Sequence, residues 1–146
     1  MLSNSCRYAI RAVIYLASKE KEKSLTGIRQ ISKDLDLPSP FLAKILQQLA
    51  RKKILKSVKG PHGGFILLKD PSEITLLDIV NIIDGEEIFT DCLIHEGSCR
   101  SVNHMKKPCP VHFGYSAIRK SIMDFFSTNT IEEIIKKMKY PGSAAI

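Results

Sequence analysis

Apolar residues recur at helical spacing along most of this chain, and this pattern predicts a mainly α-helical fold. The first helix, predicted over residues 3–19, is apolar on most of its sides, which is typical of a buried helix. Further helices are predicted over residues 27–35, 39–51, 74–83, 110–126 and 131–138, with Thr75 and Thr130 as candidate N-caps. Residues 86–108 show no such period, so an irregular loop is expected there.

The second and third predicted helices form a helix-turn-helix pattern, because only a tight turn over residues 36–39 separates them. Ser39 is expected at the N-cap of the third helix, with Pro40 at its first helical position. The side of this helix that is predicted to be buried carries Leu42, Ile45, Leu46 and Leu49. The opposite side carries Ala43, Lys44, Gln47, Gln48 and Arg51. A second helix with a basic, amide-bearing outer face is typical of one that enters the major groove of DNA.

A small hairpin is predicted directly after this helix. Residues 56–59 and 65–68 form its expected strands, and Gly60, Gly63 and Gly64 supply the permissive backbone that a hairpin tip needs. The predicted fold class is therefore mainly α with a small β-hairpin wing, that is, a winged helix-turn-helix. A long C-terminal helix follows, and its apolar face exceeds what a small monomer needs to cover, so dimerisation is expected through Phe113, Ala117, Ile118, Ser121, Ile122 and Phe125.

Charge is distributed unevenly over the 146 residues, whose net charge is +7. Residues 1–70 hold 14 Lys and Arg against 5 Asp and Glu, whereas residues 71–146 hold 8 against 10. The stretch from residue 37 to residue 69 holds no acidic residue, but seven Lys and Arg and one His. Such a stretch predicts contact with the phosphate backbone of a nucleic acid. The expected DNA-binding residues are Ser39, Pro40, Lys44, Gln47, Gln48, Arg51, Lys59 and His62.

Their expected roles follow from their chemistry. Gln47 and Gln48 can form paired hydrogen bonds with adenine edges in the major groove. Lys44 and Arg51 can reach guanine or phosphate. The wing residues Lys59 and His62 can enter or flank the minor groove.

A second group of residues predicts a metal or cluster site: Cys92, Cys99, Cys109 and His112. Thiolates and imidazole are soft ligands that suit iron–sulfur clusters or zinc. The gaps of six and nine residues between the cysteines exceed those of common structural zinc sites, which favours a cluster, either [2Fe–2S] or [4Fe–4S]. Cys109 directly precedes the predicted helix, whose dipole favours a thiolate, whereas His112 is the weaker ligand candidate.

The chain is expected to divide into a DNA-binding domain (residues 1–85), a cysteine-bearing sensor loop (86–112) and a dimerisation region (113–140). It contains no run of eighteen apolar residues and no signal-peptide pattern, so a cytoplasmic location is expected. Disulfides are rare in that compartment.

Several motifs resemble the Rrf-two (BadM-type) family of bacterial transcription regulators. They are Arg7–Ala9, Tyr15–Ala17, Pro40–Leu42, Leu49–Ile54, the glycine-rich Ser57–Phe65, Ile74–Ile79 ending at Gly85, and Cys-Pro-Val-His ending at His112. The resemblance implies a homodimer of winged helix-turn-helix heads that binds a double-stranded DNA operator. It also implies an iron–sulfur cluster on the three cysteines and control of genes for cluster assembly, nitrosative or redox stress, or sulfur metabolism.

The leading interpretation is a cluster-dependent transcriptional repressor. A second keeps DNA binding but makes the cysteines a thiol-redox or zinc switch, or leaves them unligated. A third, a small iron–sulfur electron carrier, does not explain the acid-free stretch. An enzyme is the least favoured class, because no third residue is evident to orient Cys109 and His112 for catalysis.

Overall fold

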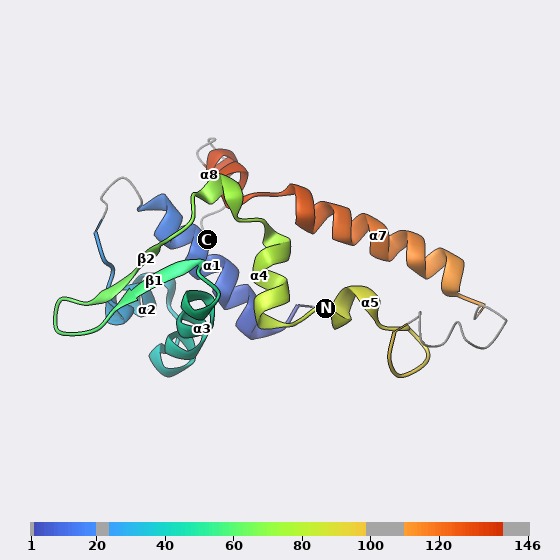
Figure 1. Cartoon of the computed structure of the whole chain (residues 1–146), viewed down its shortest axis with the longest axis horizontal. Coiled ribbons are helices and arrows are strands. Elements are labelled where there is room, and N and C mark those ends of the chain that lie inside the picture. The colour runs from blue at the N-terminus through green and yellow to red at the C-terminus, as the bar shows by residue number, and fades with distance from the viewer. Residues whose placement is uncertain (1, 20–23, 99–109, 139–146) are drawn as a thin grey trace.

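A computed structural model describes residues 2–19, 24–98 and 110–138 (Figure 1). Its elements are α1 (Asn4–Ser18), α2 (Ile28–Leu35), α3 (Ser39–Arg51), β1 (Leu55–Val58), β2 (Gly64–Leu67), the 3₁₀ turn η2 (Pro71–Glu73), α4 (Leu76–Ile83), α5 (Glu87–Thr90), α7 (His112–Thr128) and α8 (Ile131–Met138). The predicted fold class, mainly helical with one hairpin, is confirmed. In this part of the chain no helix is long and apolar enough to cross a membrane.

Helix α1 is the centre of the core. Seven of its residues are buried, among them Val13, Ile14 and Leu16, and α3, α4 and α8 pack against it. Ser3 caps this helix, because its hydroxyl accepts a hydrogen bond from the Cys6 N–H at 3.0 Å.

Helices α2 and α3 form the predicted helix-turn-helix. Asp36 ends α2 in the left-handed conformation, with φ of 51°, and the Leu37 N–H donates to the Ser32 carbonyl at 2.9 Å. The expected N-cap of α3 was wrong by one residue: Pro38 occupies it, and α3 begins at Ser39. The Ser39 hydroxyl donates to the Ser32 hydroxyl at 2.8 Å, so it ties α3 to α2 and does not cap α3.

Strands β1 and β2 pair antiparallel, each starting one residue before its predicted position. The segment before α2 also pairs with the hairpin. Thr26 forms an antiparallel bridge with Phe65 of β2, through backbone hydrogen bonds of 3.0 and 2.9 Å. Gly64 permits this close approach, and Gly63 permits a second one within the hairpin. A Cβ on Gly63 would lie 2.1 Å from the Val58 carbonyl oxygen, and one on Gly64 would lie 2.5 Å from that of Thr26.

Helix α4 begins at the predicted cap. The Thr75 hydroxyl accepts from the Asp78 N–H at 3.1 Å, and the Asp78 carboxylate accepts from the Thr75 N–H at 2.9 Å, which forms a reciprocal capping box. The expectation of an irregular loop over residues 86–108 needs one correction. Residues 87–90 form the single turn α5, which Phe89 anchors against Phe126 of α7 with ring centroids 5.8 Å apart.

Helix α7 contacts α4 and α5 and projects beyond them at its N-terminal end, and α8 packs back against α1 (Figure 1). Two backbone hydrogen bonds close this return: Leu76 N–H donates to Asn129 at 3.1 Å, and Ile131 N–H donates to Ile74 at 2.9 Å. Ile131 is completely buried, and α8 packs against α1 and η2.

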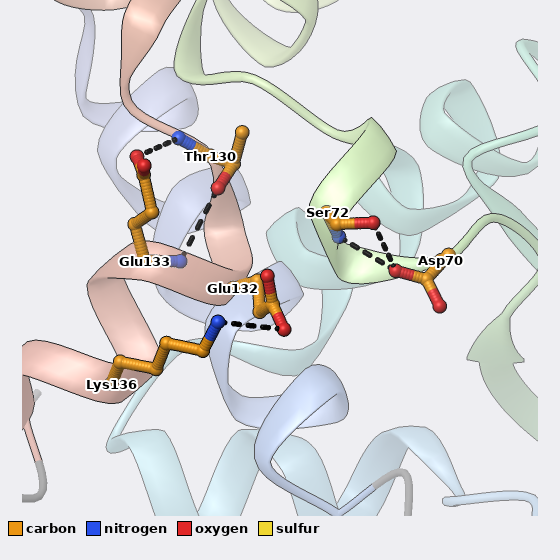
Figure 2. A network of polar contacts seen from close by, with 6 residues as sticks. All are labelled: Asp70, Ser72, Thr130, Glu132, Glu133 and Lys136. Atoms are coloured by element: carbon orange, nitrogen blue, oxygen red, sulfur yellow. Dashed lines mark hydrogen bonds and ion pairs between the residues drawn. The ribbon is translucent and has the colours of Figure 1, made fainter.

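Figure 2 shows the polar contacts around this return. Thr130 and Glu133 cap α8 reciprocally at 3.2 Å, which confirms the predicted cap. Asp70 accepts from the Ser72 N–H at 2.8 Å and so holds η2. An ion pair of 3.0 Å between Glu132 and Lys136 runs along the outer surface of α8.

Candidate DNA-binding surface and cysteine loop

Helix α3 presents two chemically different faces. Leu42, Ile45, Leu46 and Leu49 are buried against the core. Lys44, Gln47, Gln48 and Arg51 are exposed on the outer face. Because the apolar stripe fixes the helix against α1, the polar face has a defined orientation toward solvent.

A cleft of about 600 Å³ separates α3 from the wing. Gln47 and Ala43 line it from α3, Gly27 and Arg29 from the start of α2, and Val58 with the glycine-rich tip from the wing. None of the lining residues is acidic. The helix and the wing therefore border one continuous non-acidic surface.

The predicted DNA-binding residues are distributed over both borders of this surface. Pro40, Lys44, Gln48 and Arg51 are exposed on α3, and Lys59 and His62 are exposed at the wing tip. Ser39 is half-buried and hydrogen-bonded to Ser32, so its hydroxyl is already engaged within the helix-turn-helix.

Arg29 is a candidate that the sequence pattern did not predict. It is exposed, it lies in the first turn of α2, and it lines the cleft opposite the wing. Asp34 and Asp36 follow it closely in the sequence, so it falls outside the acid-free stretch. Its position at the start of the first helix of a helix-turn-helix was the available signal, because that helix crosses the DNA backbone.

Cys92 lies in a short closed loop. Its N–H donates to the Gly97 carbonyl at 2.8 Å, and Asp91 pairs with Ser98 in an isolated antiparallel bridge. The next ligand candidates in the sequence, Cys99 and Cys109, lie outside the described residues.

The loop is attached to α7 through Arg119. One guanidinium nitrogen donates to the carbonyls of Thr90 and Asp91 at 2.9 and 3.0 Å. A cavity of about 510 Å³ opens beside this anchor, and Cys92, Tyr115 and Arg119 are among its lining residues. His112 precedes Tyr115 by three residues and Arg119 by seven, so all three lie on one face of α7.

Cys6 has a different environment from Cys92. It is completely buried in α1, and burial, with a smaller contribution from the Asp84 carboxylate, raises its pKa to about 12. A thiol of this kind is inert, because the thiolate is the reactive form.

A complete ligand set is not seen within the described part of the chain. Residues 2–19, 24–98 and 110–138 contain no group of three Cys, His, Asp or Glu side chains that could hold a metal ion. Two of the three predicted cysteine ligands, Cys99 and Cys109, lie outside these ranges, so the ligand set stays a prediction.

One face of α7 is apolar and exposed. Phe113 is 73% exposed and Phe125 is 57% exposed, and the exposed Ile118 lies on the same side of the helix. Of the other residues predicted for this face, Ala117 and Ser121 are exposed and Ile122 is half-buried. Phe126 faces the other way, toward α5, and is buried.

Comparison with known proteins connects these features to one family. The model of the Rrf2 family, described as an iron-dependent transcriptional regulator, matches residues 2–137. An HTH-type transcriptional regulator of Aquifex aeolicus is 35% identical over 135 residues, which cover 92% of this chain and 91% of that protein. The HTH-type transcriptional regulator IscR of Photorhabdus laumondii is 26% identical over 138 residues, which cover 94% of this chain and 80% of that protein. The structure of CymR, the global cysteine regulator of B. subtilis, has a similar fold, with a TM-score of 0.76 at 23% identity and coverage of 94% of this chain and 97% of that chain.

Proposed function

The chain belongs to the Rrf2 family of transcriptional regulators, and we propose that it acts as a homodimeric repressor whose operator affinity depends on an iron–sulfur cluster held by three cysteines. Regulators of this family bind DNA and are not enzymes. The observation that carries the DNA-binding part of the proposal is the continuous, acid-free surface formed by α3, the start of α2 and the wing.

In this proposal α3 enters the major groove. Gln47 and Gln48 read base edges there, while Lys44 and Arg51 contact guanine or phosphate. The wing tip, with Lys59 and His62, follows the backbone into the adjacent minor groove. Arg29 contacts the phosphates that lie over the cleft.

A second copy of the chain is the proposed partner of α7. Phe113, Ala117, Ser121 and Phe125 follow one another at i, i+4 spacing along this helix, so their exposed side chains form one long row that is largely apolar. A symmetric pair of such helices would bury this row and would place two α3 helices on successive half-sites of a pseudo-palindrome.

The geometry of the described part of the loop supports the proposal that the three cysteines bind one cluster. Ser98 pairs with Asp91, and Cys99 and Cys92 each follow one of these two residues directly in the sequence. The cavity beside Cys92 reaches the first two turns of α7, which starts three residues after Cys109. A soft donor set of three thiolates fits an iron–sulfur cluster, with His112 as the proposed fourth ligand. A bound cluster would connect the cysteine loop to α7, and its charge would change with its redox state.

A cluster-free thiol or zinc switch is the second candidate for the same loop. A similarly folded protein is named a global cysteine regulator, and thiols can carry such a signal without iron. The DNA-binding surface has the same role under both candidates.

The test begins with anaerobic purification of the full chain. Visible absorption with stoichiometric iron and sulfide supports the cluster, whereas a colourless protein with bound zinc or with no metal supports the second candidate. Cys92→Ala, Cys99→Ala and Cys109→Ala should each remove the cluster and shift operator affinity by a similar factor, about 5- to 150-fold. His112→Ala should have a milder effect.

Cys6→Ala is the matched control, because it removes a thiol that lies outside the loop. It should leave both the absorption and the operator affinity unchanged. Equal operator affinities for the holo protein and for all three loop variants would exclude the sensor half of the proposal.

A further inference from the structure

Phe41 is the one aromatic residue of α2 and α3, and its side chain is 62% exposed in the first turn of the recognition helix α3. It precedes Lys44 by three residues and Gln48 by seven, so the three side chains form one row along the helix surface. The residues between them that face inward, Leu42 and Ile45, are buried.

The surroundings of Phe41 restrict what could cover its ring. Residues 37–69 contain no acidic residue and seven Lys and Arg, so the partner must be anionic. The exposed ring of Phe41 also requires that this partner offer an apolar group at the point of contact. The major groove of duplex DNA offers this combination, because the C5-methyl group of thymine projects into a groove bordered by phosphates. The apolar face of α7, with Phe113 and Phe125, belongs to another helix and shares no residue with this row.

We propose that Phe41 is a specificity-determining residue, whose ring contacts a thymine methyl group in each operator half-site. This inference rests on the proposed function and deepens it. The first residues of a recognition helix contact base edges, and Phe41 lies in that turn. Gln47 and Gln48 would select adenine by hydrogen bonding, whereas Phe41 would select against bases that lack the methyl group.

The test uses a duplex that the full chain selects from a random-sequence pool. Deoxyuridine lacks only the C5-methyl group, so single symmetric replacements of thymidine by deoxyuridine locate each methyl contact. At the positions read by Phe41, wild-type affinity should fall about fourfold per methyl group, the value expected for one buried methylene-sized group. Phe41→Ala should bind the unmodified duplex more weakly by a similar factor and should show no further loss at those positions.

Two controls separate this contact from general effects. Phe41→Leu keeps an apolar side chain and should retain part of the discrimination between thymidine and deoxyuridine. Leu68→Ala removes an apolar side chain of similar exposure, 53%, from outside α3 and should retain all of it.

Three results would overturn the inference. One is a Phe41→Ala variant that keeps the full thymidine preference at every position. Another is a wild-type protein that is indifferent to every replacement. The third is unchanged affinity of Phe41→Ala, which would leave an apolar protein partner as the occupant of the ring. Failure of the chain to select any duplex would instead overturn the proposed function itself, and this inference with it.

Discussion

Asp84, at the C-terminal end of α4, accepts hydrogen bonds from both the backbone N–H and the hydroxyl of Ser3, at the start of α1. The N–H contact measures 2.8 Å. The same Ser3 hydroxyl accepts from the Cys6 N–H and so caps α1. The Asp84 carboxylate thus connects the start of α1 to the end of α4. The segment that leads to Cys92 begins directly after this connection.

Removing this carboxylate should loosen the junction. Asp84→Ala should lower the free energy of unfolding by about 1–2 kcal/mol, because it removes two hydrogen bonds to a charged acceptor at a partly exposed position. Asp84→Asn keeps one acceptor oxygen and should lower it less. Urea denaturation followed by circular dichroism measures both variants, and equal stability of the alanine variant and the wild type would contradict the assigned role.

The buried thiol of Cys6 should make stability fall at alkaline pH. Its pKa is raised from 9.0 to about 12, chiefly by burial, so above pH 9 the unfolded chain loses a proton that the folded chain keeps. Between pH 9 and 12 the unfolded state therefore binds fewer protons, and the thiol's contribution to stability decreases as pH rises. The difference in unfolding free energy between wild type and Cys6→Ala should shrink over this window. A difference that is constant with pH would contradict the raised pKa.

The two wing glycines should tolerate no side chain. In Gly63→Ala the new methyl group would overlap the Val58 carbonyl, so the hairpin tip must distort, and in Gly64→Ala it would overlap the Thr26 carbonyl, so the hairpin must move away from Thr26. The strain should lower stability by roughly 1–3 kcal/mol and weaken operator binding. Gly114→Ala is the matched control, because its Cβ meets nothing within 4 Å and helix propensity favours alanine by up to about 1 kcal/mol. Thermal unfolding and operator titration compare the three variants.

Arg29 should contribute to the salt dependence of operator binding. Removing one phosphate contact should flatten the log–log slope of affinity against salt by about 0.9. Arg29→Ala should therefore flatten the slope, as should Lys44→Ala and Lys59→Ala. Lys33→Ala removes an exposed cation from the last turn of the same α2 helix, does not line the cleft and should leave the slope unchanged. Equal slopes for Arg29→Ala and Lys33→Ala would exclude a phosphate contact at Arg29.

A charge on the apolar face of α7 should prevent the proposed dimerisation. Phe113→Glu places a carboxylate where the proposed dimer buries an apolar ring, so the sedimentation mass at micromolar concentration should change from dimer to monomer. Lys136→Glu changes charge on α8, away from that face, and should remain dimeric. A monomeric wild type under the same conditions would remove the basis for this prediction.

The elements that the sequence predicted best are those with a local chemical signal. Thr75 and Thr130 each precede an acidic residue by three positions, and both form the caps expected of them. Ser39 illustrates the limit of such signals. Its hydroxyl could cap α3, but the restricted backbone of Pro38 starts the helix one residue earlier, and Ser32 engages the hydroxyl.

Features that depend on tertiary contacts were not predictable in the same way. The single turn α5 is too short to show a period, and it is anchored by Phe89 packing against Phe126. Adjacent phenylalanines at positions 125 and 126 look alike in sequence, but only the second packs inward. The helix-turn-helix pattern could have indicated Arg29, but that it lines a cleft with the wing depends on the wing folding back to face α2.

Because α8 packs back against α1, the folding unit that carries α3 and the wing is built from two separate parts of the sequence. Residues that bracket α7 in the sequence close the same core, since Ile74 and Ile131 are both fully buried and joined by a backbone hydrogen bond. Helix α7 is therefore part of an insertion within this folding unit and not a C-terminal extension of it. Cutting the chain at residue 85 would remove α8 from this core, so DNA binding and the proposed pairing through α7 cannot be separated by simple truncation. A single proteolytic cut within residues 91–98 would instead leave two fragments that still share one core.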